Sequence, residues 1–208
     1  LGPFFISMTS NWFVGAYKNY NDIDKYVIII YLINKDLLFY RRNGINIDYD
    51  TFYKDRVLEI EKINISDISK DLEIPKESVR RKVAELEKMG EIKKIGKKIF
   101  LNRTAIHTAQ AKNTLSELCI LLHEFNKLLK KDKLSNNIFD LNEINKSIKN
   151  NFTFCWYQFY KFMFIYLNRW KKEVNDLETF CIAQVVVVNA AQNKGFKPSK
   201  STMKSWRE

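Results

Sequence analysis

Four lysines surround a single glycine near the middle of this 208-residue chain. The glycine is Gly96, and Glu91 is the one acid in the stretch from Gly90 to Arg103. Ammonium groups on a projecting loop suit phosphate oxygens, along a nucleic-acid backbone or in a minor groove. The chemistry that this cluster predicts is therefore recognition of a polyanion. The four residues are Lys93, Lys94, Lys97 and Lys98.

A second group of polar residues precedes the lysines, in a segment with helical spacing. From Lys76 to Met89 the apolar residues recur every three or four positions, which predicts a helix with one buried face. Pro75 prepares the start of this helix, and Gly90 supplies its end. On the outward part of the first turns, the spacing leaves Lys76, Glu77, Ser78, Arg80 and Arg81.

Short elements on either side of this helix complete the pattern. Ser66 stands where a helix cap belongs, and Ile68 and Leu72 lie on one face, so a short helix is expected from Ser66 to Leu72. Beyond Gly90, two β-like runs are predicted to form a hairpin whose turn holds Gly96. The runs are Glu91–Ile95 and Lys98–Asn102.

The order of helix, turn, helix and basic hairpin resembles the winged helix-turn-helix domain of bacterial transcriptional regulators of the GntR, IclR and MarR types. The resemblance extends from Ile65 to Asn102, about a fifth of the chain, and is carried by the text SVRRKVAELEKMGEIKK and by the glycine in the hairpin turn. The sequence departs from the pattern at Glu73, where many relatives carry glycine. It also departs at Glu77, where small or basic residues are common.

The resemblance implies that the helix beginning at Lys76 enters the major groove of duplex DNA. An arginine there would read guanine, because its fork matches the O6 and N7 acceptors, and Glu77 would read a cytosine amino group or weaken binding. The preceding helix and the hairpin would contact phosphates. The DNA-binding residues that the resemblance implies are Ser69, Lys70, Lys76, Ser78, Arg80, Arg81, Lys93, Lys94, Lys97 and Lys98.

The rest of the chain is expected to be helical. Phenylalanine and tyrosine number 15 and 10, against 6 glycines and 3 prolines, which excludes a turn-rich all-β protein and a disordered one. The predicted fold is mainly α, a winged helix-turn-helix with a small β-hairpin wing, flanked by helical N- and C-terminal regions. The predicted organisation is an N-terminal helical segment (1–50), the DNA-binding domain (51–103), a helical dimerisation or effector region (104–192) and a basic tail (193–208).

Two of the expected helices contain runs that would also suit a strand. Tyr26–Tyr31 is favoured as helix because the whole pattern from Asp22 to Arg42 lacks a turn signal, whereas Val185–Val188 stays open between helix and strand. Asp50 is expected to cap the helix predicted from Thr51 to Lys62. The helices predicted outside the winged helix-turn-helix pattern of Ile65–Asn102 are Ser10–Tyr20, Asp22–Arg42, Thr51–Lys62, Thr104–Lys131, Leu141–Ile148, Phe152–Val174 and Leu177–Gln192.

Nine aromatic residues between Phe152 and Tyr166 lie around the whole circumference of one predicted helix. Such a helix must be covered on several sides, so a protein core or a homodimer interface is favoured. The alternative is a pocket for a small-molecule effector, because such pockets are concave and mostly apolar.

Several classes of function lack their characteristic residues. The three cysteines lie far apart without a CxxC pair, and His107 and His123 have no metal-ligand spacing, so neither a metal site nor a cofactor is expected. The sequence has no glycine-rich nucleotide loop and no nucleophile motif, and no enzyme activity is predicted. It also shows no signal peptide and no membrane span, which favours a cytoplasmic location. The cysteines are Cys119, Cys155 and Cys181.

The charge balance agrees with a polyanionic partner. Lysine and arginine number 35 against 24 acids, which gives a formal charge of +11. The sequence thus predicts a homodimeric regulator of transcription that binds specific sites in double-stranded DNA, with two recognition helices in major grooves roughly 34 Å, or a multiple of that distance, apart. The alternative is a replication, phage or plasmid-maintenance protein that uses the same domain as an initiator or adaptor.

Overall fold

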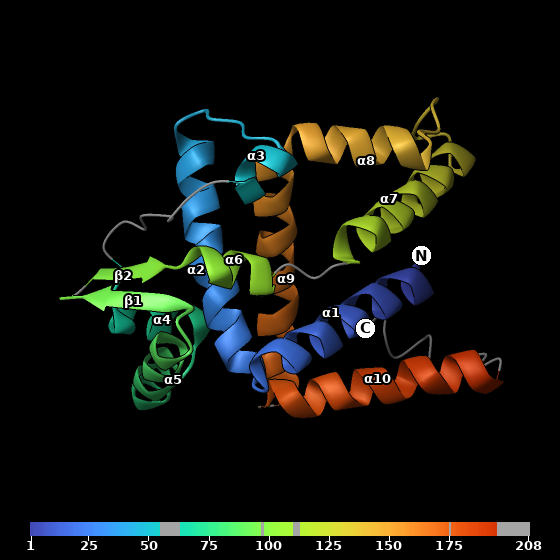
Figure 1. Ribbon diagram of the computed structural model, residues 1–208. Coiled ribbons are helices and arrows are strands. Elements are labelled where there is room, and N and C mark those ends of the chain that lie inside the picture. The colour runs from blue at the N-terminus through green and yellow to red at the C-terminus, as the bar shows by residue number, and fades with distance from the viewer. Residues whose placement is uncertain (55–62, 97, 110–112, 175, 195–208) are drawn as a thin grey trace.

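The computed structural model describes residues 1–54, 63–96, 98–109, 113–174 and 176–194. Over these residues the protein is mainly helical, with one two-stranded antiparallel hairpin, as the composition predicts (Figure 1). The elements are α1 (Gly2–Tyr20), α2 (Ile23–Arg42), α3 (Tyr49–Lys54), α4 (Ile65–Leu72), α5 (Lys76–Lys88), β1 (Ile92–Ile95), β2 (Lys98–Leu101), α6 (Arg103–Ala109), α7 (Thr114–Lys131), α8 (Leu141–Asn150), α9 (Phe152–Val174) and α10 (Leu177–Lys194).

Helix α2 runs through the centre of the molecule. All of its residues from Tyr26 to Ile33 are buried, so the run that locally resembles a strand forms a helix covered on every side. Helix α2 packs along α9 (Figure 1). It also contacts α1, α4, α5, α6 and β2. The side chain of Asp22 caps the helix by accepting a hydrogen bond from the Lys25 N–H at 3.0 Å.

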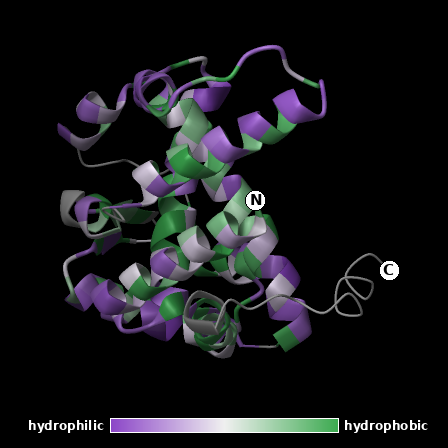
Figure 2. Cartoon of the chain, turned by 90° about the vertical axis from the view of Figure 1, so that its right-hand side faces the viewer, coloured by the Kyte–Doolittle hydropathy of each residue, from purple (hydrophilic) through white to green (hydrophobic). Residues whose placement is uncertain are grey.

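The aromatic run of α9 contributes to the core. Phe152, Trp156, Phe159 and Tyr160 are buried, and the rings of Phe152 and Trp156 stack with their centroids 5.0 Å apart. Trp12 of α1 meets Phe159 edge to face. One continuous core includes buried residues from the predicted ranges 1–50, 51–103 and 104–192. In Figure 2 the hydrophobic segments gather where the helices meet, and hydrophilic segments lie mostly around them.

Several helix boundaries differ from the sequence prediction. Helix α1 begins at Gly2, eight residues before the expected start at Ser10, because Pro3 suits a first helical turn. The cap of α3 is Asp48 and not Asp50, since the Asp48 carboxylate accepts from the N–H and the hydroxyl of Thr51 at 3.0 and 2.7 Å. The expected continuation of this helix over 55–62 and the basic tail beyond residue 194 lie outside the described residues.

The single helix expected over Thr104–Lys131 is two helices, α6 and α7. The two have different neighbours, since α6 contacts α2 and α1 whereas α7 packs on α1 and α8. Ala105 and Ile106 of α6 are buried in the core around α2, and this packing fixes the direction of α6. Helices α8, α9 and α10 lie where they are expected, and the Val185–Val188 run is helical. Within the described residues, no helix has the length and hydropathy needed to cross a membrane.

Candidate nucleic-acid interface

Helices α4 and α5 meet across the short turn from Glu73 to Pro75. Their contact is apolar and belongs to the main core, with Ile68, Leu72, Val79, Val83 and Leu86 all buried. Glu73 adopts a left-handed conformation with φ 52°, so this position, where the winged helix-turn-helix pattern often has glycine, has a backbone that favours glycine.

Ser69 has a structural contact within this turn. Its side chain is half-buried, and its hydroxyl donates a hydrogen bond to the Ile74 carbonyl at 2.7 Å. This bond closes the turn between α4 and α5. The resemblance implied a phosphate contact for Ser69, whereas its hydroxyl is here engaged with the protein; Lys70, the next residue, is exposed.

The cap of α4 differs from the expectation. Helix α4 begins at Ile65, and Asn64 accepts a hydrogen bond from the Asp67 N–H while the Asp67 carboxylate accepts from the Asn64 N–H. This reciprocal pair is a capping box. Ser66, the predicted cap, lies exposed in the first turn because the chain enters the helix two residues earlier.

The outward face of α5 carries cations. Lys76 is exposed, Ser78 is half-buried, and the side chains of Arg80 and Arg81 are 57% and 70% exposed. Both arginines have a carboxylate of α5 nearby, at 2.8 Å for Arg80 with Glu77 and 3.9 Å for Arg81 with Glu85. Exposed pairs of this kind contribute only about 0.3–0.5 kcal/mol, so both guanidinium groups remain available to a ligand.

The hairpin is fixed to the body at its base and projects at its turn. Strands β1 and β2 pair with Ile92 opposite Leu101 and Ile95 opposite Lys98, and Gly96 takes a left-handed φ of 61° in the turn. The side chains of Lys93 and Lys94 are exposed. Lys97 and the side chain of Lys98 lie outside the described part of the structure. Ile92, Ile99 and Leu101 anchor the base in the core.

A hydrogen bond connects the hairpin directly to α5. The Lys94 N–H donates to a Glu87 carboxylate oxygen at 2.9 Å. Glu87 lies seven residues, or about two turns, after Arg80, so both lie on the hairpin side of α5. Arg81 lies about 100° further around the helix, toward Glu85. The hairpin lysines and the two arginines therefore belong to one rigid unit.

Glu91, the acid of the hairpin stretch, does not oppose the lysines at the surface. It is only 5% exposed, and burial raises the pKa of its carboxyl group, an effect that a hydrogen bond with Thr108 opposes. The Glu91 carbonyl accepts from the Asn102 N–H at 2.8 Å, and the Asn102 side chain donates to the Gly90 carbonyl at 2.7 Å. These bonds close the hairpin next to the end of α5.

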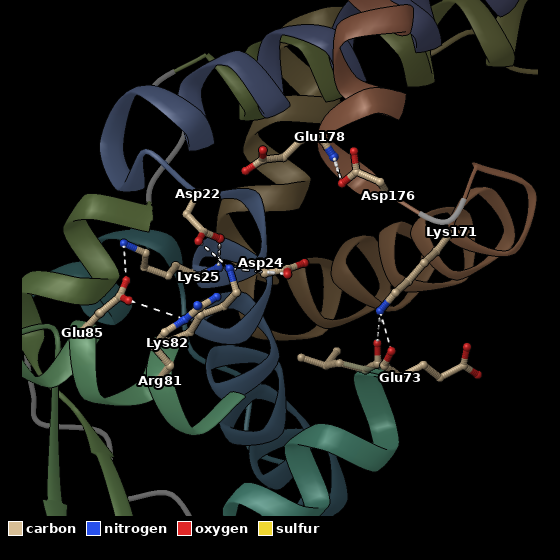
Figure 3. A network of polar contacts seen from close by, with 11 residues as sticks. Asp22, Asp24, Lys25, Glu73, Arg81, Lys82, Glu85, Lys171, Asp176 and Glu178 are labelled. Carbon is tan, nitrogen blue, oxygen red and sulfur yellow. Dashed lines mark hydrogen bonds and ion pairs between the residues drawn. The ribbon is translucent and has the colours of Figure 1, made fainter. Parts of the chain in front are cut away.

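Ion pairs attach α5 to the beginning of α2 (Figure 3). Lys82 pairs with Asp22 and lies 3.5 Å from a carboxylate oxygen of Asp24, while Lys25 pairs with Glu85 at 2.9 Å. Lys82 is buried and was not among the residues predicted for the site. Lys82 is next to Val83 and three residues after Val79, so it lies at the border of the apolar stripe of α5. This spacing was the signal in the sequence that Lys82 would be buried.

A second set of polar contacts holds α4 and the turn. Lys171 of α9 donates to the carbonyls of Leu72 and Glu73 at 2.8 and 2.7 Å, and Figure 3 shows Lys171 pointing toward Glu73. Burial lowers the pKa of Lys171, and the charges of Asp24 and Glu73 oppose this effect. On α4, Asp71 accepts from the Tyr31 hydroxyl at 2.7 Å. Both long core helices, α2 and α9, thus fix the unit.

The described residues offer no group of three or more histidine, cysteine and acidic side chains that could hold a metal ion. This surface presents the exposed cations of α4, α5 and β1 together with exposed acids, among them Glu77 and Glu87 of α5. Comparisons with protein-family models, with curated proteins and with solved structures find no match to this chain.

Proposed function

We propose that α4, α5 and the hairpin form a winged helix-turn-helix that binds specific sites in double-stranded DNA, and that the protein regulates transcription as a homodimer. The observation that supports this most is the two-sided character of α5. One side is packed on the core and paired with α2, and the other exposes Lys76, Arg80 and Arg81. A basic helix face held rigidly by its opposite side is what major-groove recognition requires.

The dimensions suit this mode of binding. Helix α5 has 13 residues and is about 20 Å long, while the major groove is about 12 Å wide. Ala84 is exposed one turn after Arg80 and Arg81, and its small side chain allows the helix backbone to approach the base edges. Lys93 and Lys94 then contact the flanking phosphates, since they are tied to the hairpin side of α5 by Glu87.

The proposal is tested by fluorescence anisotropy on duplexes that the purified protein selects from a random library. The variant with Arg80→Ala and Arg81→Ala is expected to lose about 10- to 100-fold in affinity for the selected duplex, because a bidentate arginine contact contributes roughly 1–3 kcal/mol. Arg169→Ala is the matched control, since Arg169 is 76% exposed on α9 and is also paired with an acid four residues later. It is expected to leave the affinity unchanged.

The lysines of the hairpin are tested by salt dependence. Lys93→Ala and Lys94→Ala are each expected to weaken binding to all duplexes alike and to reduce the salt slope by about one unit. Wild-type affinity in the double arginine variant, or an equal loss in the Arg169→Ala control, would reject the proposal. The genomic positions of the selected sites, beside promoters or at an origin of replication, separate a transcriptional regulator from an initiator.

A further inference from the structure

The outward face of α10 lacks the charges of a solvent-facing helix. Between Glu178 and Lys194 the chain has no Asp, Glu, Lys, Arg or His. The side facing away from the core carries Ile182 and Val186, which are 66% and 60% exposed. The same side carries Thr179 and Asn189, which are exposed and polar but uncharged. Large exposed apolar side chains on a face without charges are typical of a contact surface. The outward face of α10 is therefore a candidate interface.

The exposed apolar surface continues onto α1, which packs beside α10. Val14 and Tyr17 of α1 are partly exposed, and with Ile182 and Val186 they line a groove of about 470 Å³ between the two helices. Helix α10 has 18 residues and is about 27 Å long, and two adjacent helices are about 20 Å wide. A face of this size offers roughly 500–600 Å² to a partner, at the lower end of specific interfaces.

We infer that a second copy of this chain covers the face, in an antiparallel pairing of the two α10 helices about a two-fold axis near Val186. Ala183 and Ala190 are seven residues apart on the exposed side, so two α10 backbones can approach closely. Antiparallel packing opposes the two helix dipoles. The antiparallel arrangement also places the first turn of one α10, which contains Glu178, beside the last turn of the other, which ends at Lys194.

Other occupants fit less well. A helix that lies on a membrane surface has lysines and arginines along its polar face, and α10 has none between its two ends. The residues after α10 include Phe196, Met203 and Trp206, but four cations are interspersed among them, so this segment suits an uncharged face less well than a second α10 does. The cations are Lys197, Lys200, Lys204 and Arg207. A two-fold pair is also the commonest protein assembly, and the inference supplies the homodimer of the proposed function, on which it partly rests.

The test is sedimentation velocity without DNA, from about 1 to about 100 µM protein, because an interface of this size predicts reversible association at micromolar concentrations. The mass of the wild-type protein is expected to rise from 24.8 kDa toward twice that value. Ile182→Glu is expected to raise the dimer dissociation constant at least about tenfold. Ile165→Glu, at a site 63% exposed on α9, is the matched control and leaves it unchanged.

Cross-linking gives a second reading of the geometry. Val186→Cys, close to the axis, is expected to form an intermolecular disulfide with a mild oxidant, whereas Ile165→Cys is not. A wild-type protein that stays monomeric at 100 µM, or an Ile165→Glu variant that dissociates as much as Ile182→Glu, overturns the inference. So does a monomer that binds vesicles of phosphatidylcholine through this face.

The proposed dimer and the proposed DNA contact can be disproved independently of each other. The variant with Arg80→Ala and Arg81→Ala is expected to dimerise like the wild type, since both side chains lie on α5 and not on α10. The Ile182→Glu monomer is expected to bind a half-site and to lose the added affinity for the full site. A dimer that binds no duplex would reject the proposed function and retain the α10 interface.

Discussion

Lys82 of α5 forms an ion pair with Asp22, the residue that caps the central helix α2. A carboxylate oxygen of Asp24 also lies within 4 Å of the Lys82 ammonium group. In the opposite direction, Lys25 of α2 forms an ion pair with Glu85 of α5. The first half of α2 is buried, and buried core helices are the most stable parts of a protein. These ion pairs therefore orient α5 relative to a rigid element. The outward face of α5 is thereby held in one orientation relative to the core.

Replacing Lys82 by methionine keeps its aliphatic stem and removes its charge. The free energy of unfolding is expected to fall by about 2 kcal/mol, because Asp22 and Asp24 lose the cation that compensates their partial burial. Urea unfolding measures the change. Lys88→Met, at an exposed position of the same helix, is the control and should stay within about 0.5 kcal/mol of the wild type. Equal effects of the two variants would contradict the prediction.

The cap of α4 can be tested against the position that the sequence suggested. Asn64→Ala is expected to lower the free energy of unfolding by about 1 kcal/mol, because it leaves the Asp67 N–H without its acceptor. Ser66→Ala should cost less than about 0.5 kcal/mol, since Ser66 is exposed inside the first turn. The reverse order in urea titrations would restore Ser66 as the cap.

The turn between α4 and α5 has a residue that its backbone does not favour. Glu73→Gly is expected to raise the free energy of unfolding by about 0.5–1 kcal/mol, because glycine adopts a positive φ without a Cβ penalty. The carbonyl that accepts from Lys171 is kept. Glu77→Gly, inside α5, should have the opposite sign and cost about 1 kcal/mol. Thermal unfolding of the two variants compares them; a loss of stability in both would disprove the prediction.

Stability is expected to depend on pH through Asp36, which is buried on α2 with one carboxylate oxygen that has no hydrogen-bond partner. Burial raises its pKa from 3.8 to about 7. The unfolded chain therefore loses this proton at a lower pH than the folded protein does. The free energy of unfolding therefore falls as the pH rises from about 4 to about 7, and above that range the buried Asp36 carboxylate lowers it by about 4 kcal/mol.

The variant Asp36→Asn should remove this dependence. Relative to the wild type, its stability is expected to increase between pH 4 and pH 8, as measured by urea titrations at both values. Asp50→Asn, at an exposed position of α3, should show no comparable gain. A parallel pH profile for Asp36→Asn and the wild type would refute the assignment.

Glu77 is the acid at the centre of the proposed DNA-binding face, and it pairs with Arg80. Glu77→Gln is expected to tighten binding to all duplexes by about three- to tenfold, because it removes a negative charge that faces phosphates and releases Arg80. Anisotropy with selected and unrelated duplexes measures both effects. A loss of affinity confined to the selected duplex would instead show that Glu77 reads a cytosine.

Local patterns determined much of the secondary structure. Helix α9 occupies Phe152–Val174 and the hairpin turns at Gly96, both as predicted, because the unbroken helical pattern and the glycine turn are properties of neighbouring residues. The mainly helical fold with one small hairpin is likewise confirmed. The exposure of Arg80 and Arg81 also follows from local spacing, since the apolar residues of α5 select one side for burial.

Contacts between distant segments decided the remaining features. The break between α6 and α7 depends on which helices cover each of them, and the burial of Lys82 depends on carboxylates 58 and 60 residues earlier in the chain. Periodicity reports which side of a helix is apolar, but it does not report what lies opposite. The sequence alone therefore determined that a basic helix and a basic hairpin would form. Only the tertiary structure decided that α2 and α9 hold them as one surface, because that depends on long-range pairing.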